Sequence, residues 1–91
     1  MIRRETKAGK VRITFALPDD HPAGRVSVVG DFNGWTPGVH RLAQRSNGTR
    51  SVAVSVTPGV AYRFRYLGEG GYWFDDPDVD ARENADGVVH V

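Results

Sequence analysis

The chain has 91 residues, of which 40% are hydrophobic and 25% are charged, a composition typical of one small soluble domain and not of a disordered chain. It contains no cysteine, which excludes disulfide bonds and thiolate metal sites. The formal net charge of +1 is too small to indicate a nucleic-acid partner or an anionic membrane surface.

The first ten residues, MIRRETKAGK, carry several charges but no apolar run. We therefore expect a flexible N-terminal extension at residues 1–10 rather than a signal peptide. No stretch approaches the length that a membrane span requires, so no membrane partner is expected. We expect residues 11–91 to form a single domain and the chain to be cytoplasmic.

Apolar and polar residues alternate in several short runs, the period-two pattern of strands with one buried face. In chain order the runs are 11–17, 25–29, 52–56, 62–67, 72–74 and 88–91, separated by turn signals at Pro18, Asn33-Gly34, Pro37-Gly38, Pro58-Gly59 and 68–71. Apolar residues do not recur at helical spacing, so no substantial helix is expected. The pattern predicts an all-β sandwich or small barrel, with Phe15, Phe32, Tyr62 and Phe64 in its core.

Charge is distributed unevenly between the two ends of the chain. Five basic residues lie near the start and six acidic residues near the end: Arg3, Arg4, Lys7, Lys10 and Arg12, and Asp75, Asp76, Asp78, Asp80, Glu83 and Asp86. Such clusters usually form solvated surfaces. Opposite charges also predict that the two ends attract each other across the fold.

The run from Tyr62 to Leu67 indicates an exposed face. If its aromatic residues point inward, Arg63 and Arg65 point outward together. The glycine-rich turn at 68–71 predicts a hairpin that returns the chain beside this run, and the same alternation then directs Trp73 outward. Parity therefore places Trp73 on the face that carries Arg63 and Arg65.

The second tryptophan, Trp35, directly follows the Asn33-Gly34 turn. A two-residue hairpin turn would place Phe32 and Trp35 opposite each other and bury both. A less regular loop would leave Trp35 facing outward. Periodicity alone does not choose between these arrangements.

Three segments, VSVVGDFNGW, YRFRYLGEGGYWFDDP and NADGVVHV, together resemble the family 48 carbohydrate-binding modules. These modules occur in glycogen branching and debranching enzymes and in the β subunit of the AMP-activated protein kinase. The resemblance covers nearly the whole chain from Val11 onward. It implies an immunoglobulin-like, early-set β-sandwich of about seven short antiparallel strands. It also implies non-catalytic binding of α-1,4-linked glucans such as glycogen, starch and malto-oligosaccharides, and makes residues 11–91 a glycan-binding domain.

The resemblance also implies which residues bind the sugar. Trp35 and Trp73 match the two tryptophans that stack on glucose rings, and Arg63 falls where kinase-type modules place a lysine, so its guanidinium group is expected between the two indoles. Asp86 replaces an asparagine of those modules and can accept hydrogen bonds from sugar hydroxyls but cannot donate amide ones. Arg65 and Asn84 are further candidates for contacts with the sugar.

Other functions fit the residues less well. The acidic run 75–80 has too little apolar cover to raise the pKa of one carboxyl as a glycosidase requires, and no nucleophile motif is present, so no enzymatic activity is expected. The spacing of Asp76, Asp78 and Asp80 copies the start of an EF-hand loop, but Ala81 and Gly87 occupy the positions of its glycine and its closing glutamate. We therefore expect neither a metal nor another cofactor.

Two binding functions remain as alternatives for the same Trp and Arg face. Exposed aromatic side chains between arginines also suit single-stranded nucleic acid, although the low net charge and the acids after Trp73 oppose a polyanion. The face could instead dock a protein, such as a glycan-processing enzyme.

Overall fold

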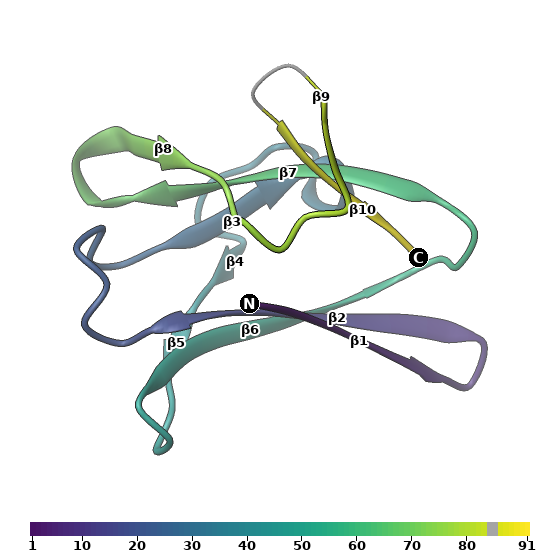
Figure 1. The fold of residues 1–91 in the computed structure, drawn as a ribbon, viewed down its shortest axis with the longest axis horizontal. Helices are drawn as coiled ribbons and strands as arrows, with labels where there is room; N and C mark the ends of the chain where they lie inside the picture. Colours follow the sequence, from purple (N-terminus) through teal and green to yellow (C-terminus); the bar gives the residue numbers. More distant parts are fainter. Residues whose placement is uncertain (84–85) are drawn as a thin grey trace.

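The computed structural model describes residues 1–83 and 86–91, which fold into two antiparallel sheets packed as a sandwich (Figure 1). One sheet has the order β1-β2-β6-β5, with β1 Ile2–Lys7, β2 Lys10–Pro18, β6 Thr49–Val56 and β5 Ala43–Gln44. The other has the order β4-β3-β7-β10-β9, with β4 His40–Arg41, β3 Ser27–Gly30, β7 Ala61–Gly68, β10 Asp86–His90 and β9 Ala81–Glu83; β8, Tyr72–Phe74, also pairs with β7.

Two short 3₁₀ turns, η1 (Asp31–Asn33) and η2 (Glu69–Gly71), are the helical elements that the described residues contain. Neither is long and apolar enough to cross a membrane. The prediction of an all-β sandwich without a substantial helix is confirmed.

Aromatic rings fill the space between the two sheets. Phe15 from β2 meets Phe64 from β7 at a ring-centroid distance of 4.8 Å, and Tyr66 packs edge-on against both rings. The core prediction is confirmed for Phe15 and Phe64, which are fully buried. Phe32 and Tyr62 are half-buried and pack against the side of this core.

The N-terminal segment differs from the expectation of a free extension. Residues 2–7 form β1, which pairs along its whole length with β2. The connecting residues Ala8 and Gly9 both have positive φ, 52° and 77°, the conformation of a tight hairpin turn that matches the twist of its strands. Because β1 is an edge strand with mostly exposed side chains, it needs no alternation of apolar residues, and periodicity could not detect it.

Strand β7 lies at the centre of the six-stranded sheet and organises the region described next. Its residues 64–67 pair with β3 along one edge. Along the other edge, β10 pairs with residues 61–64 and β8 with residues 66–68. Strands β10 and β8 thus follow each other along the same edge of β7.

Candidate functional site

The outer face, meaning the surface of the six-stranded sheet turned away from the other sheet, carries Arg63, Arg65 and Leu67 from β7. Leu67 lies opposite Ser27 of β3 and opposite Trp73 of β8, and directly opposed residues share a face. The prediction that Trp73 lies on the same face as Arg63 and Arg65 therefore agrees with the strand register.

Two valines lie buried on this outer face. Val29 pairs with Arg65 and Val88 pairs with Arg63, so both share the face of the arginines. Their exposed fractions are 0% and 7%, yet neither belongs to the cluster of residues between the sheets. The polar and aromatic side chains of the outer face thus cover an apolar layer of their own.

The loop that carries Trp35 is not a two-residue hairpin. Gly34 and Trp35 both adopt left-handed backbone conformations, with φ of 62° and 58°, and the Trp35 amide donates to the Gly30 carbonyl over 2.9 Å. Asn33 braces the loop, because its Oδ1 accepts from the Gly30 amide and its Nδ2 donates to the Val28 carbonyl. The less regular arrangement is therefore the one present, and it leaves Trp35 partly exposed.

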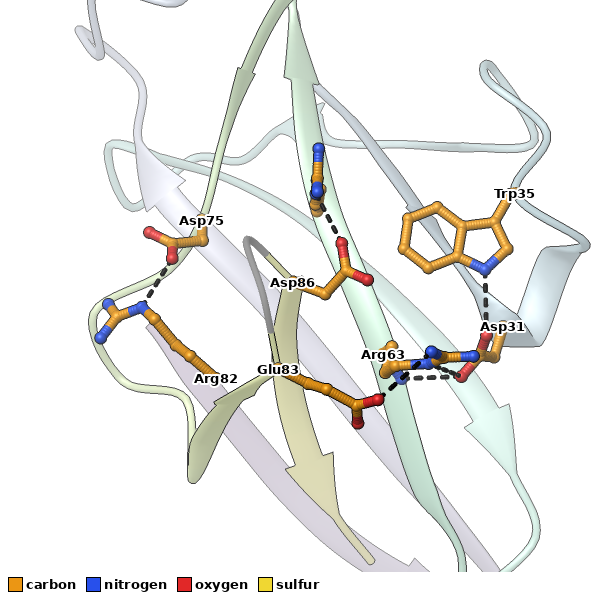
Figure 2. Close-up of polar contacts among 8 residues, drawn as sticks. Asp31, Trp35, Arg63, Asp75, Arg82, Glu83 and Asp86 are labelled. Atoms are coloured by element: carbon orange, nitrogen blue, oxygen red, sulfur yellow. Dashed lines mark hydrogen bonds and ion pairs between the residues drawn. The ribbon is translucent and has the colours of Figure 1, made fainter.

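A positive φ is unfavourable for a bulky side chain, with a strain of about 1–3 kcal/mol. The loop holds Trp35 there through the bonds just described and through its side chain. The indole Nε1–H donates to Oδ1 of Asp31 over 2.9 Å (Figure 2). Strained residues that their surroundings hold in place are common at binding sites.

Asp31 connects the Trp35 loop to the central strand. Its Oδ2 accepts the backbone amide of Arg63 over 2.9 Å and lies 3.5 Å from the Arg63 Nε. Partial burial raises the pKa of Asp31, but the hydrogen bonds from the Arg63 amide and the Trp35 indole, with the Arg63 charge, outweigh this and leave the pKa below its ordinary value. Asp31 was not predicted as a site residue from the sequence. Its position four residues before Trp35 in the same loop could have indicated a contact between the two side chains.

The arginines of the outer face are paired with carboxylates. Arg63 also lies 3.6 Å from Glu83 of β9, and the Nε of Arg65 donates to Oδ1 of Asp86 over 2.5 Å (Figure 2). Asp86 and Arg65, two separately predicted site residues, are thus brought together in one ion pair. Their mutual ion pair occupies one oxygen of Asp86 and leaves its other oxygen to accept further hydrogen bonds.

The register revises the expected position of Arg63. Residues two apart along β7 are about 7 Å apart, so Arg65 occupies the row between Arg63 and Leu67. Trp73 lies beside Leu67, and Arg63 lies beside the Asp31 that holds Trp35. The guanidinium group in the row next to Trp73 is therefore that of Arg65, not that of Arg63.

The two exposed aromatic residues of β8 point to opposite sides. Trp73 is 45% exposed on the outer face. Tyr72 is 57% exposed but lies on the other side, where its ring stacks on Phe74 at 5.3 Å. Tyr72 thus points to the side of the sheet opposite Trp73, as the alternation predicted, but its ring remains exposed to solvent.

The acidic segment after Trp73 is used largely for structure. Asp76 is fully buried and accepts the Tyr66 hydroxyl over 2.7 Å and the Asp78 amide over 2.8 Å. Burial, and then the adjacent Asp76 charge, raise the pKa of Tyr66 far above its ordinary value. Asp75 pairs with Arg82 over 2.7 Å. No group of three or more histidine or acidic side chains in the described residues is arranged to hold a metal ion.

The oppositely charged ends of the chain do meet. Arg4 of β1 pairs with Asp80, and Asp80 also accepts the His90 amide over 2.8 Å. The hydrogen bond from His90 is the largest cause of a lowered pKa at Asp80, and the Arg4 charge adds to it. The remaining site prediction, Asn84, lies outside the residues that the structure describes.

Comparison with known proteins shows that the chain is similar to part of several 1,4-alpha-glucan branching enzymes. No family model matches it. The 1,4-alpha-glucan branching enzyme GlgB 2 of Xanthomonas campestris pv. campestris is 35% identical over 83 residues, which cover 89% of this chain and 11% of the enzyme. The branching enzyme GlgB of Corynebacterium jeikeium is 39% identical over 72 residues, covering 77% of this chain and 10% of the enzyme, and that of Synechococcus elongatus is 35% identical over 57 residues, covering 62% and 7%.

The chain therefore spans about a tenth of the length of the curated relatives it matches. It is similar to a small part of these enzymes.

Proposed function

We propose that this chain binds α-1,4-linked glucans, without catalysis, on its outer face. The observation that carries the proposal is the exposed indole of Trp73, 45% exposed on the outer face that carries Arg63 and Arg65. It is supported by the partly exposed Trp35, whose indole donates to Asp31 beside Arg63. The similarity to 1,4-alpha-glucan branching enzymes supports glucan as the ligand.

A glucose ring has C–H groups on its faces and hydroxyls around its rim, so a flat indole with polar neighbours is complementary to it. Each indole can remove apolar area from water at about 25 cal/mol per Å². Rim hydroxyls exchange water for groups such as Arg65 and Asp86, with a net gain of about 0.5–1.5 kcal/mol per hydrogen bond. Ordering costs offset much of this, so we expect a single-site Kd of about 10⁻⁵ to 10⁻³ M.

The charges of the outer face argue for a neutral ligand. Arg63 and Arg65 are matched by Asp31, Glu83 and Asp86, so the part of this face around these two arginines has no positive excess. A single-stranded nucleic acid needs such an excess for its phosphates. The same ion pairs hold the guanidinium groups in place.

The proposal also suggests how this domain works together with an enzyme. A weak glucan site is most useful where many sites on a polymer are available or where it holds a glucan-processing enzyme on its substrate. We therefore propose that this domain is an accessory to such an enzyme. Its proposed partner is glycogen or a similar polymer, and its proposed location is the cytoplasm.

A titration with maltoheptaose or β-cyclodextrin, followed by amide and indole N–H chemical shifts, tests the proposal. We expect saturable shifts of both indole signals at millimolar ligand, and a weakening of at least about tenfold in Trp73→Ala. Tyr72→Ala is the matched control, because Tyr72 is the adjacent and more exposed ring but points to the opposite side. Indole signals that stay unmoved, or equal losses in both variants, would contradict glucan binding on the outer face.

A further inference from the structure

A concave site apart from the proposed glucan-binding residues is lined by residues of β3, β4, β5, β6 and β7 and their flanks. Its volume is about 510 Å³, within the usual range for small-molecule sites of about 300–1,000 Å³. Three arginines line it, Arg25, Arg41 and Arg50, together with Gln44 and Ser27. None of the proposed glucan-binding side chains belongs to it.

Arg50 has an unusual position for a charged residue. It lies on β6 opposite Leu17, and its parity is that of Val52, Val54 and Val56, so it points toward the space between the sheets. One terminal nitrogen donates to the Gly24 carbonyl over 3.1 Å. Its Nε is buried and has no hydrogen-bond partner. An inward-pointing guanidinium group normally has a carboxylate partner, because desolvating its charge is costly.

No carboxylate supplies that partner. Among the residues that the structure describes, none of the three guanidinium groups forms an ion pair, whereas Arg63 and Arg65 of the outer face and Arg82 of β9 all do. The Glu69 carboxylate approaches Gly24 from the neighbouring turn without pairing with these arginines. The cavity therefore has a concentrated positive charge in a protein whose net charge is only +1.

We infer that this cavity binds a phosphate monoester. Such a group carries a charge of about −1.5 to −2 at neutral pH and three acceptor oxygens, and guanidinium groups are the side chains best suited to bind them in pairs. The amide of Gln44 and the hydroxyl of Ser27 add neutral hydrogen-bonding groups to the lining. The volume exceeds that of a phosphate alone and leaves room for an attached sugar ring.

The cavity is continuous with the outer face. Arg41, Ser27, Leu67 and Trp73 form one row across β4, β3, β7 and β8, and the first three of these residues line the cavity. A sugar stacked on Trp73 would therefore have the arginine cavity beside it along the row. The phosphate can be that of a free sugar phosphate or a substituent of the glucan chain; the second source rests on the proposed function.

The experiment follows backbone amide and arginine Nε–H signals during titration with glucose 6-phosphate and with inorganic phosphate at fixed chloride concentration, with glucose as the uncharged control. We expect saturable shifts at the three arginines with both phosphate probes. A double variant, Arg25→Gln with Arg41→Gln, should weaken binding at least about tenfold, because two charge-assisted contacts are lost. Its matched control is Arg3→Gln with Arg12→Gln, which removes the same charge from exposed positions on β1 and β2.

A third arm compares maltotetraose with the same oligosaccharide carrying one 6-phosphate. Tighter binding of the phosphorylated form, lost in the Arg25/Arg41 double variant, identifies the glucan as the source of the phosphate; equal binding of glucose 6-phosphate alone identifies the free sugar phosphate. If maltotetraose fails to bind while glucose 6-phosphate still shifts the arginines, the proposed function falls and the phosphate site stands. No saturable shift with either phosphate probe, or equal weakening in both double variants, overturns the phosphate site whatever the glucan result.

Discussion

Replacing Asp31 with alanine should affect both stability and glucan binding. The carboxylate accepts the Trp35 indole and the Arg63 amide, each over 2.9 Å, and lies beside the Arg63 guanidinium group. Hydrogen bonds to charged groups contribute about 1.5–3 kcal/mol each when buried. Since the Asp31 side chain is 31% exposed, water compensates part of the loss. We expect Asp31→Ala to lower the free energy of unfolding by about 1–2 kcal/mol, or the Tm by about 5–15 °C.

The same change should weaken glucan binding about two- to tenfold, because ordering a freed Trp35 side chain upon binding costs about 0.5–1.5 kcal/mol. Urea denaturation and a maltoheptaose titration measure the two effects. Asp75→Ala is the matched control: its side chain is 32% exposed and pairs with Arg82, but in the described residues it accepts no hydrogen bond from an indole. We expect it to cost less than about 1 kcal/mol and to leave glucan affinity unchanged.

The pH dependence provides a further check on Asp31. Its pKa in the folded protein lies below the ordinary value of 3.8, so its stabilising contribution is complete above that pH and is lost as the pH falls through the folded-state pKa. The stability difference between the wild type and Asp31→Ala should therefore be constant near neutrality and shrink below pH 3.8. An Asp31→Ala variant with wild-type affinity and unchanged exchange of the Trp35 indole proton would refute the role of Asp31 in holding that ring.

Three further predictions concern the core, the loop and the ligand. Tyr66→Phe should lower the stability at neutral pH by about 1–3 kcal/mol, because the fully buried Asp76 loses a donor. Because the pKa of Tyr66 is raised from 10.0, the wild type should also lose stability as the pH rises above that value, and urea denaturation should show a smaller alkaline loss in Tyr66→Phe. Gly30→Ala should destabilise the fold more than Gly59→Ala in thermal unfolding, since an added Cβ at Gly30 would lie 2.5 Å from the carbonyl oxygen of residue 63, whereas at Gly59 it meets nothing within 4 Å and only the positive φ is unfavourable. Maltoheptaose affinity measured by calorimetry should hardly change between low and high salt, and a steep decrease with salt would instead support nucleic-acid binding.

The aromatic region of the outer face and the arginine cavity differ in the partners of their arginines. On the outer face, the guanidinium groups of Arg63 and Arg65 are held by carboxylates, which orient them and offset their charge. In the cavity beside β4, Arg25, Arg41 and Arg50 lack such partners in the described residues. Neutral and anionic ligands are thus expected at neighbouring but chemically distinct places.

Much of the fold and of the outer face could be predicted from the sequence, because both depend on local alternation. The period-two pattern around Tyr62 to Leu67 was sufficient to assign one face to the core and the other to Arg63 and Arg65, and the glycine-rich turn then placed Trp73. Strand β1 was not predicted, because an edge strand with mostly exposed side chains has no such alternation.

Only the tertiary structure decided how these side chains are held and combined. The choice between a hairpin and a strained loop at Trp35 depends on the contact between Gly30 and β7 and on the carboxylate of Asp31, which joins two segments about thirty residues apart. The arginine cavity likewise gathers residues from five strands or their flanks. Only the packing of these strands shows that no described acidic residue lines it. The alternation of apolar and polar residues predicts which way a side chain points. The packing of the sheets decides which residues lie next to it across the fold, and these neighbours determine its charge state and its rigidity.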